Sequence, residues 1–425
     1  MTNVDIRHGD CLEVLRGLPD NSVDSVVTDP PYGLSNTKPQ QVADVLAAWV
    51  KGDTVSVPAK RGGFMGKDWD SFVPPPAVWE ECMRVLKPGG HMAVFAGSRT
   101  QDLMGLSIRL AGFEIRDTLG WIYGSGFPKS KNIARQLDKT LGEDVPIGKA
   151  FNTAGGGDRE SEFASNGRSK AHEQWSPMSD PAKQWDGWGT ALKPAIEPII
   201  LARKPLDGTV ANNVLAHGVG GLNIDACRVG DEVMPKGAST GEVVSENGSM
   251  AGPNTGRVVV GSVTGRFPAN VLLDEHAAAE MDKQSGIAKP KPARTGKRGG
   301  SAWHGMESLG SPDKCGHWPE DAGGGASRFF PVFKYQAKAP KKERPVIERE
   351  DGSKIQHPTV KPLALMEWLV TLITPPAGLV LDPFAGTGTT LQAARDKGFK
   401  VIGVEQDPEY IQLIETRLEA DGGLF

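Results

Sequence analysis

Residues 379–390 read Leu-Val-Leu-Asp-Pro-Phe-Ala-Gly-Thr-Gly-Thr-Thr, and this stretch decides the fold class. Its apolar start predicts a buried strand, and residues 391–397 predict the helix that follows. The turn between them carries Gly386 and Gly388, and glycine allows a backbone to approach a ligand closely. A further strand is expected at Val401–Val404, so the stretch opens a strand–helix–strand unit of a parallel sheet.

The chain up to residue 123 follows the same alternation of strands and helices. The expected strands are Val4–Arg7, Val23–Thr28, His91–Ala96 and Glu114–Tyr123. The helix expected at Ala77–Leu86 should stop at Lys87-Pro88-Gly89-Gly90, because proline and glycine terminate helices. Together the two ends of the chain predict an α/β fold, a doubly wound parallel sheet with helices on both faces.

The middle of the chain has a different composition, rich in Gly, Ser, Asn and Pro. Asn152–Gly157 and Gly237–Gly256 resemble loops or inserts. Apolar strands are nevertheless expected at Ile196–Ala202 and Asn270–Leu273. Five tryptophans also lie here, namely Trp175, Trp185, Trp188, Trp303 and Trp318. Disordered segments seldom carry so many aromatic residues, so we expect a partly ordered, loop-rich module.

The overall composition excludes several classes of protein. The formal net charge is −4, so any contact with nucleic acid must come from local basic patches. The four cysteines are scattered without a C-x-x-C pair, which argues against a zinc site and a disulfide framework. The N-terminus has no apolar signal core, and no apolar run reaches the length of a membrane span. We therefore expect a cytoplasmic protein with no membrane partner.

The sequence Asp29-Pro30-Pro31-Tyr32 follows an expected strand and is the candidate catalytic motif. Ligands of open α/β sheets bind at the carboxyl ends of the strands. A carboxylate and a proline carbonyl can accept both hydrogens of an –NH₂ group, which frees the nitrogen lone pair for attack. Tyr32 offers an aromatic face to a base that has left the duplex. A rigid surface turn would explain the prolines, but not an acid and an aromatic together at this edge.

A cofactor site is expected at the glycine-rich turn. Glu405 ends the strand after it, and a carboxylate there can accept hydrogen bonds from both hydroxyls of a ribose. No lysine follows Gly388, so the turn is not the phosphate-binding loop of triphosphatases, and it also lacks the full G-x-G-x-x-G pattern. From this turn alone, a nucleotide-like ligand and a plain tight turn both stay open.

Taken together, the motifs resemble those of a known family. Asp-Pro-Pro-Tyr near the start and Asp-Pro-Phe-Ala-Gly-Thr-Gly-Thr-Thr near the end are similar to the two signatures of the amino-methylating DNA methyltransferases. Their order resembles the beta group of that family, with the catalytic motif first, target recognition in the middle and the cofactor motif last. His357–Pro362 resembles a further cofactor motif of the group. Residues 188–206 and 266–274 resemble phage and prophage members.

The resemblance implies a circularly permuted, Rossmann-like sheet that binds S-adenosyl-L-methionine. The chain would start two strands late, with the missing first strands placed at its end. The implied segments are 1–123 (catalytic half), 124–192 (loop-rich insertion within a terminal hairpin), 193–205 (hairpin strand), 206–330 (target recognition) and 331–425 (cofactor half). The implied cofactor-binding residues are Asp10, Thr359, Lys361, Asp382, Phe384, Gly386, Gly388, Thr389 and Glu405.

The resemblance also implies double-stranded DNA as the partner. Basic residues without nearby acids are candidates for phosphate contacts. They are Lys129, Lys131, Lys289, Lys291, Arg294, Lys297 and Arg298. A solvated basic loop would show the same composition. A homodimer, a cognate restriction nuclease and the recognition sequence are not decided by the sequence, and the expected setting is a bacterial or phage-infected cell.

The expected activity is transfer of a methyl group to the N6 amine of adenine. Adenine is preferred over the N4 amine of cytosine because cytosine members of the family more often have Ser where this chain has Asp29. Enzymes that methylate cytosine carbon need a Pro-Cys pair, which the chain lacks. RNA or protein-amide methylation and an inactive DNA-binding module remain as alternatives. Asn is usual at this position in the amide enzymes, and the intact motifs disfavour an inactive module.

Overall fold

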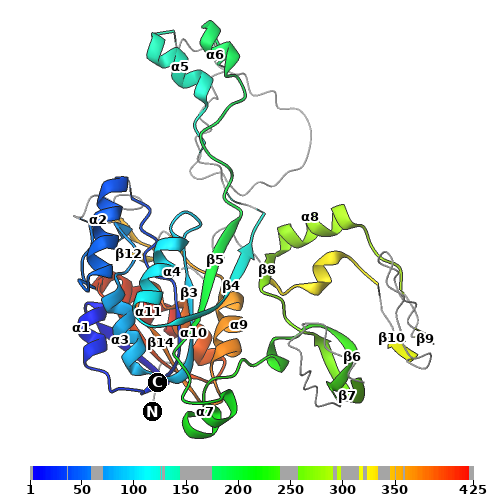
Figure 1. Cartoon of the computed structure of the whole chain (residues 1–425). Coiled ribbons are helices and arrows are strands. Elements are labelled where there is room, and N and C mark those ends of the chain that lie inside the picture. Colours follow the sequence, from blue (N-terminus) through cyan, green and yellow to red (C-terminus); the bar gives the residue numbers. More distant parts are fainter. Residues whose placement is uncertain are drawn as a thin grey trace. The chain divides into compact units, whose positions relative to one another are not determined.

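The computed structural model describes most of the chain. The described residues are 3–35, 37–58, 70–124, 126, 130–143, 175–239, 257–290, 294–297, 315–318, 323–333, 345–349, 351–357 and 359–420. Two compact units are distinguished (Figure 1): unit 1 comprises Met1–Gly124 with Ile196–Phe425, and unit 2 comprises Ser125–Ala195.

Unit 1 is built on a nine-stranded sheet with the order β1-β15-β14-β2-β3-β5-β4-β8-β11. These strands are β1 (Val4–His8), β2 (Val23–Thr28), β3 (Leu86–Phe95), β4 (Glu114–Ile122), β5 (Ile196–Arg203), β8 (Val271–Asp274), β11 (Val332–Phe333), β14 (Leu379–Asp382) and β15 (Lys400–Glu405). All neighbours pair in parallel except β5, which runs antiparallel to β3 and β4. The last strands of the chain thus lie inside the sheet between β1 and β2, which confirms the permuted α/β fold.

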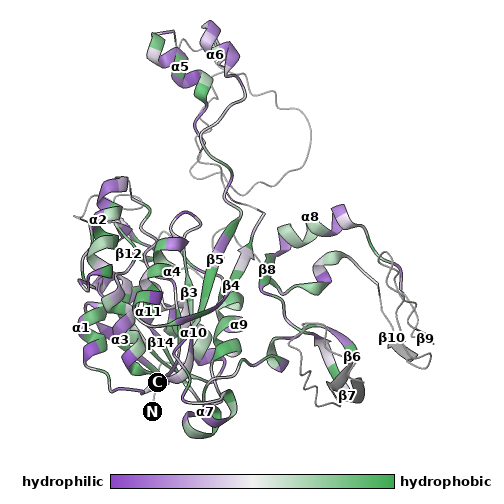
Figure 2. Ribbon diagram, viewed as in Figure 1, coloured by the Kyte–Doolittle hydropathy of each residue, from purple (hydrophilic) through white to green (hydrophobic). Residues whose placement is uncertain are grey.

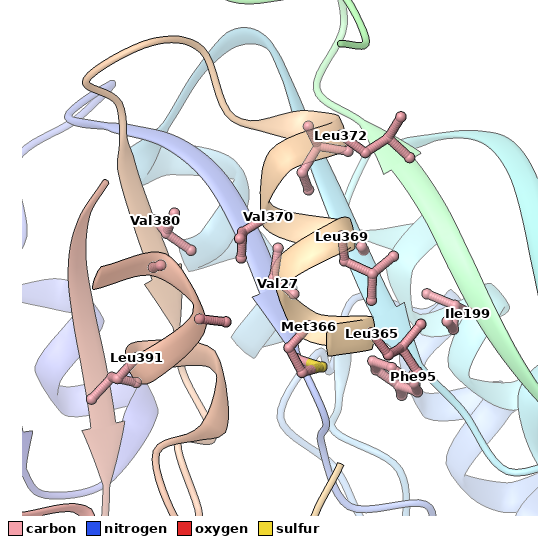
Figure 3. Packing of buried hydrophobic residues seen from close by; sticks show 14 of the residues in the cluster. Val27, Phe95, Ile199, Leu365, Met366, Leu369, Val370, Leu372, Val380 and Leu391 are labelled. Carbon is pink, nitrogen blue, oxygen red and sulfur yellow. The ribbon is translucent and has the colours of Figure 1, made fainter. Parts of the chain in front are cut away.

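Helices cover both faces of the sheet, as expected. On one face lie α1 (Cys11–Arg16), α2 (Pro39–Val50), α3 (Pro76–Val85) and α4 (Gln101–Leu110). On the other lie α9 (Leu363–Ile373), α10 (Thr389–Asp396) and α11 (Pro408–Ala420). Figure 3 shows Leu365 and Leu369 of α9 among the side chains of the strands, close to Val27, Phe95 and Ile199.

The apolar character of the strands explains their position. All six residues of β2 are buried, and so are the last six residues of β5. Figure 2 shows the hydrophobic colouring along β5. The valines of β2 and the apolar run of β5 suit the centre of a covered sheet, and the buried hydroxyls of β2 are hydrogen-bonded, Ser25 to Thr374 and Thr28 to Asp382.

The start of β3 differs from the expectation. Helix α3 ends at Val85, close to the predicted stop, but the strand begins at Leu86 rather than at His91. The Lys87–Gly90 segment forms an irregularity in the pairing of β2 and β3, where Gly89 adopts φ +76°. The Gly89 N–H donates to the carbonyls of Lys204 and Pro205. The proline and glycines that predict a turn therefore lie inside the strand.

Parts of the middle region are more regular than expected. Of the loop expected at Gly237–Gly256, Gly237–Ser239 belong to β6 (Val229–Ser239), which pairs with β7 (Arg257–Arg266). Residues 240–256 and the loop expected at Asn152–Gly157 lie outside the described residues. The strand expected at Asn270–Leu273 joins the main sheet as β8. In the supposed basic loop, residues 294–297 form β9 (Arg294–Lys297), which pairs with β10 (Cys315–Trp318). Backbone pairing partners far along the chain, which periodicity does not reveal, account for these differences.

Unit 2 is inserted between β4 and β5. Within it, α5 (Ile133–Leu141) and α6 (Asp180–Gln184) are joined through Asp138, whose carboxylate accepts hydrogen bonds from the N–H groups of Met178 and Ser179 and from the Ser179 hydroxyl. Trp185 and Trp188 stack edge to face with ring centres 4.9 Å apart. Across the described ranges of both units, no helix is long and apolar enough to cross a membrane.

Candidate functional site

The two sequence motifs meet at adjacent strand ends. Strands β2 and β14 pair in parallel, so the residues that follow them emerge at the same edge of the sheet. The Thr28 hydroxyl donates to Asp382 Oδ1 over 2.6 Å, although the two residues are 354 positions apart. The candidate catalytic and cofactor segments are therefore held together by a buried hydrogen bond.

The loop after β2 is fixed by Asp70 and Thr100, two residues that no sequence motif indicates. Asp70 Oδ1 accepts hydrogen bonds from the N–H groups of Tyr32 (2.7 Å) and Gly33 (2.9 Å). The Thr100 hydroxyl donates to the carbonyl of Tyr32 over 2.6 Å. Three backbone groups of the loop are thus satisfied, which keeps the segment after Asp29 in one conformation.

A polar cluster surrounds Asp29. The Tyr32 hydroxyl donates to Asp29 Oδ1 over 2.8 Å and also lies 3.2 Å from Glu197 Oε2. Lys361 Nζ lies 2.8 Å from Asp29 Oδ2, 3.2 Å from Glu197 Oε2 and 2.9 Å from the Tyr32 hydroxyl. From the sequence, Lys361 is expected at the cofactor, whereas the structure places its ammonium group in this cluster. Glu197 was not predicted; a lone acid in an apolar strand was the available signal.

The protonation states in the cluster follow from its charges. Burial, together with the charges of Asp29 and Glu197, raises the pKa of Tyr32 well above its usual value, so its hydroxyl stays protonated. Burial alone would lower the pKa of Lys361, but the two carboxylates outweigh it and raise the pKa above its usual value. The ammonium group also lies 5.2 Å from the ring centre of Tyr32 and 4.8 Å from that of Phe95.

The glycine turn is organised around Glu405. Its Oε2 accepts a hydrogen bond from the Gly386 N–H over 2.8 Å, and its Oε1 accepts one from the Asp407 N–H over 2.9 Å. Burial raises the pKa of Glu405 to about 7. Burial likewise raises the pKa of Asp382, which carries the bond from Thr28, to about 6. An acid at the end of β15, close to the turn, fits a ligand with paired hydroxyls.

The two glycines of the turn have different roles. A side chain at Gly386 would meet only the ring of His357, at 3.7 Å, and His357 in turn stacks on Tyr410. A side chain at Gly388 would lie 2.9 Å from Ile414 of α11. Gly388 therefore allows α11 to pack closely, whereas at Gly386 the φ of +54° is what favours glycine.

The remaining predicted cofactor residues lie around the same edge. Asp10 caps α1 by accepting from the N–H groups of Leu12 and Glu13, at the end of the strand that pairs with β15. Phe384 packs near Trp79, with ring centres 6.3 Å apart, and Thr389 begins α10. Thr359 is exposed and its N–H donates to His357 Nδ1.

A cysteine nucleophile and a metal ion are two other sources of chemistry at such an edge. Burial, reinforced by Asp10, raises the pKa of the nearby Cys11 thiol to about 12, which makes it a poor nucleophile. Among the residues described in the structure, no cluster of three or more His, Cys, Asp or Glu could hold a metal ion.

The predicted DNA-contacting residues are only partly described. Lys131 in unit 2 and Lys289 in unit 1 have exposed side chains. Lys129, Lys291 and Arg298 lie outside the described residues, as do the side chains of Arg294 and Lys297. The placement of these residues relative to the catalytic edge therefore remains a prediction.

Comparison with known proteins identifies the family to which this chain belongs. A profile of the DNA methylases that modify N6 or N4 amines matches residues 23–416, nearly the whole chain. The chain belongs to this DNA methylase family. Both motif segments and the polar cluster around Asp29 lie inside the matched range, so the residues of the candidate site are those of a family member.

Individual relatives match over shorter stretches. The type II methyltransferase M2.DpnII of Streptococcus pneumoniae is 39% identical over 66 residues, which cover 16% of this chain and 25% of the relative. M.HinfI of Haemophilus influenzae is 43% identical over 77 residues, covering 18% and 21%. A DNA modification methylase from Thermus thermophilus, solved with S-adenosyl-L-methionine, shares 17% identity and a TM-score of 0.38 over 99% of this chain and 97% of its own. The curated relatives are thus matched over about a quarter of their length.

The catalytic loop yields a prediction about stability. Gly33 adopts φ +67°, and a β-carbon there would lie 2.8 Å from the backbone nitrogen of Val73. Gly33→Ala should therefore cost the roughly 1–2 kcal/mol of a left-handed alanine and an additional steric penalty. Gly218→Ala is the control, because Gly218 has φ +73° with nothing within 4 Å of its β-carbon position. Denaturant unfolding should show a larger loss for Gly33→Ala, and equal losses would contradict the close contact.

Proposed function

We propose that this protein transfers a methyl group from S-adenosyl-L-methionine to the N6 amine of adenine in double-stranded DNA. One observation carries the proposal: the hydrogen bond between Thr28 and Asp382 joins the strand that ends in the Asp-Pro-Pro-Tyr motif to the strand that ends in the glycine turn. An acceptor for an amine and a site for a methyl donor thereby lie at neighbouring positions of one edge.

The residues of the cluster suit an attack by an exocyclic amine. Asp29 and a carbonyl of the Pro30-Pro31 turn each accept a hydrogen bond from the amine, so that the nitrogen becomes tetrahedral and its lone pair is available. When bound, S-adenosyl-L-methionine supplies a methyl group on a positively charged sulfur. The N–C bond would form as the C–S bond breaks, the sulfur would become neutral, and the methylated nitrogen would release one proton to water. Negative charge at Asp29 and Glu197 favours the positive charge that develops on the nitrogen.

The choice of adenine rests on Asp29, because a serine at this place is more frequent among the cytosine members. Tyr32 would support a base that has left the duplex, since its hydroxyl contacts Asp29. Transfer to cytosine N4 is the alternative, and the same experiment distinguishes the two. DNA contacts are assigned to the basic residues predicted from the sequence, and Lys131 and Lys289 are exposed as such contacts require.

The first prediction for this function concerns Asp29. Asp29→Asn keeps the shape of the side chain but removes the charge, so methyl transfer should fall at least about 100-fold while cofactor affinity is unchanged. The assay is transfer of labelled methyl groups to PCR-amplified, hence unmethylated, genomic DNA, with the product base identified by mass. Asp5→Asn, an exposed acid of β1, is the control and should keep full activity. Full activity of Asp29→Asn would refute the mechanism, and label on cytosine would refute the choice of adenine.

A second prediction concerns the pH dependence of cofactor binding. Burial raises the pKa of Glu405 to about 7, and ribose hydroxyls donate to its ionised form. The affinity should therefore be highest above pH 7 and fall as the pH decreases through 7, towards about tenfold per unit. Calorimetry between pH 8 and 6 should show that Glu405→Gln binds the cofactor weakly and that its affinity does not change with pH. A wild-type affinity that does not change between pH 8 and 6 would remove the Glu405 carboxylate from the ribose contact.

A third prediction concerns the basic residues. If they contact phosphates, neutralising five of them should reduce the slope of log affinity against log salt by up to about 0.9 per contact. The residues to replace with glutamine are Lys289, Lys291, Arg294, Lys297 and Arg298. Substitution is preferred to deletion because residues 294–297 pair with β10. An unchanged slope in filter binding would show that this segment does not contact DNA.

A further inference from the structure

The polar cluster around Asp29 presents a conflict with the task proposed for this residue. Asp29 Oδ1 accepts from the Tyr32 hydroxyl and Oδ2 pairs with Lys361 Nζ, so both oxygens already have a partner. A target amine needs one of these oxygens as its acceptor. The ammonium of Lys361, 2.8 Å from Oδ2, takes one of the two lone-pair directions of that oxygen and offsets the negative charge that Asp29 presents to the amine.

Lys361 has a second anion within reach. Glu197 Oε2 lies 3.2 Å from Nζ, and an ammonium group offers three N–H donors. The side chain of Lys361 is only 9% exposed. Bulk water therefore cannot solvate its ammonium group in place of Asp29. A buried cation needs a counter-charge, and Glu197 provides one when Asp29 turns to the substrate.

The surroundings of Lys361 limit where its charge can go. The ring of Phe95, fully buried at the end of β3, and the ring of Tyr32 both lie against the ammonium. Aromatic faces stabilise a cation without supplying a negative charge. Among the residues that the structure describes, Lys361 forms ion pairs with the carboxylates of Asp29 and Glu197.

We propose that Glu197 is a positioning residue that takes Lys361 from Asp29 when the target amine enters, so that Asp29 Oδ2 becomes the acceptor of an amine N–H. This inference rests on the proposed methyl transfer. Before entry, Lys361 neutralises Asp29 and keeps it in place. After entry, Lys361 pairs with Glu197, and Asp29 keeps its full negative charge toward the amine.

The net charge of the cluster of Asp29, Glu197 and Lys361 can be changed stepwise by substitution. The wild-type cluster holds two carboxylates and one ammonium, a net charge of −1. Glu197→Gln leaves Lys361 paired with Asp29 alone, with net charge 0. Lys361→Met leaves two uncompensated carboxylates, with net charge −2. The double variant returns to −1 and leaves Asp29 Oδ2 free for the amine.

The experiment measures single-turnover methyl transfer to unmethylated genomic DNA at saturating cofactor for wild type, both single variants and the double variant. Each single variant should be slower by about tenfold or more. The double variant should be faster than Glu197→Gln, because the second substitution removes the cation that blocks Asp29. If the lysine were a static brace, the double variant would be no faster than Glu197→Gln, and this result overturns the proposal.

Two controls separate this effect from folding. Rates are divided by the folded fraction from thermal unfolding. If Glu197→Gln does not fold, Glu197→Asp, which keeps the charge, is measured in its place. Glu197→Asp should retain more activity than Lys361→Met, and less activity would overturn the proposal. Glu114→Gln removes the partner of Arg203 at the opposite end of β5 and should leave the rate unchanged. An inactive wild type would refute the proposed function itself, whereas an active wild type with an unrescued double variant refutes only the exchange of Lys361.

Discussion

The hydrogen bond from Thr28 to Asp382 is the constraint on which the site depends. Asp382 is almost completely buried, and burial raises the pKa of its carboxyl to about 6. A buried carboxylate is costly unless its oxygens are bonded, and Oδ1 accepts both the Thr28 hydroxyl and the N–H of Phe384. Because Asp29 directly follows Thr28 and the glycine turn directly follows Asp382, this bond fixes the spacing between the two halves of the site.

The order of the motifs along the chain matters little to this geometry. Strands β1 and β15 pair in parallel. Directly after β1, the Gly9 N–H donates to the carbonyl of Glu405, the last residue of β15, over 3.0 Å. The first and last strands of the chain are therefore neighbours. A sheet assembled from such distant segments keeps the same edge when the chain starts at a different strand, although long-range pairings slow folding.

Local patterns predicted much of the fold because β2, β14 and the glycine turn carry their own signals. A run of apolar residues that ends in Asp29 and a glycine turn after Asp382 can be recognised without knowing their neighbours. The permuted order of the strands came from resemblance to a family, since periodicity alone does not specify which strands pair.

The partners of the catalytic loop could not be predicted in the same way. Asp70 lies 38 positions after Tyr32, and Glu197 lies 165 positions after it, so neither contact leaves a local pattern. Lys361 belongs to a segment that resembles a cofactor motif, and its long side chain reaches across to Asp29. Burial of charge is the physical clue in both cases, because an acid in the apolar strand β5 requires a cation nearby.

The cluster combines a rigid frame with one adaptable charge. The loop after Asp29 is fixed through its backbone by Asp70 and Thr100, and Glu197 belongs to a strand that is paired on both sides. Lys361 reaches the cluster through a flexible side chain, whose ammonium is held by side-chain atoms. Preorganised acceptors favour the transition state because they need not move as charge develops. A cation that shifts between the two carboxylates keeps Asp29 paired at rest, in a cluster of net charge −1, and leaves Asp29 unpaired toward an incoming amine.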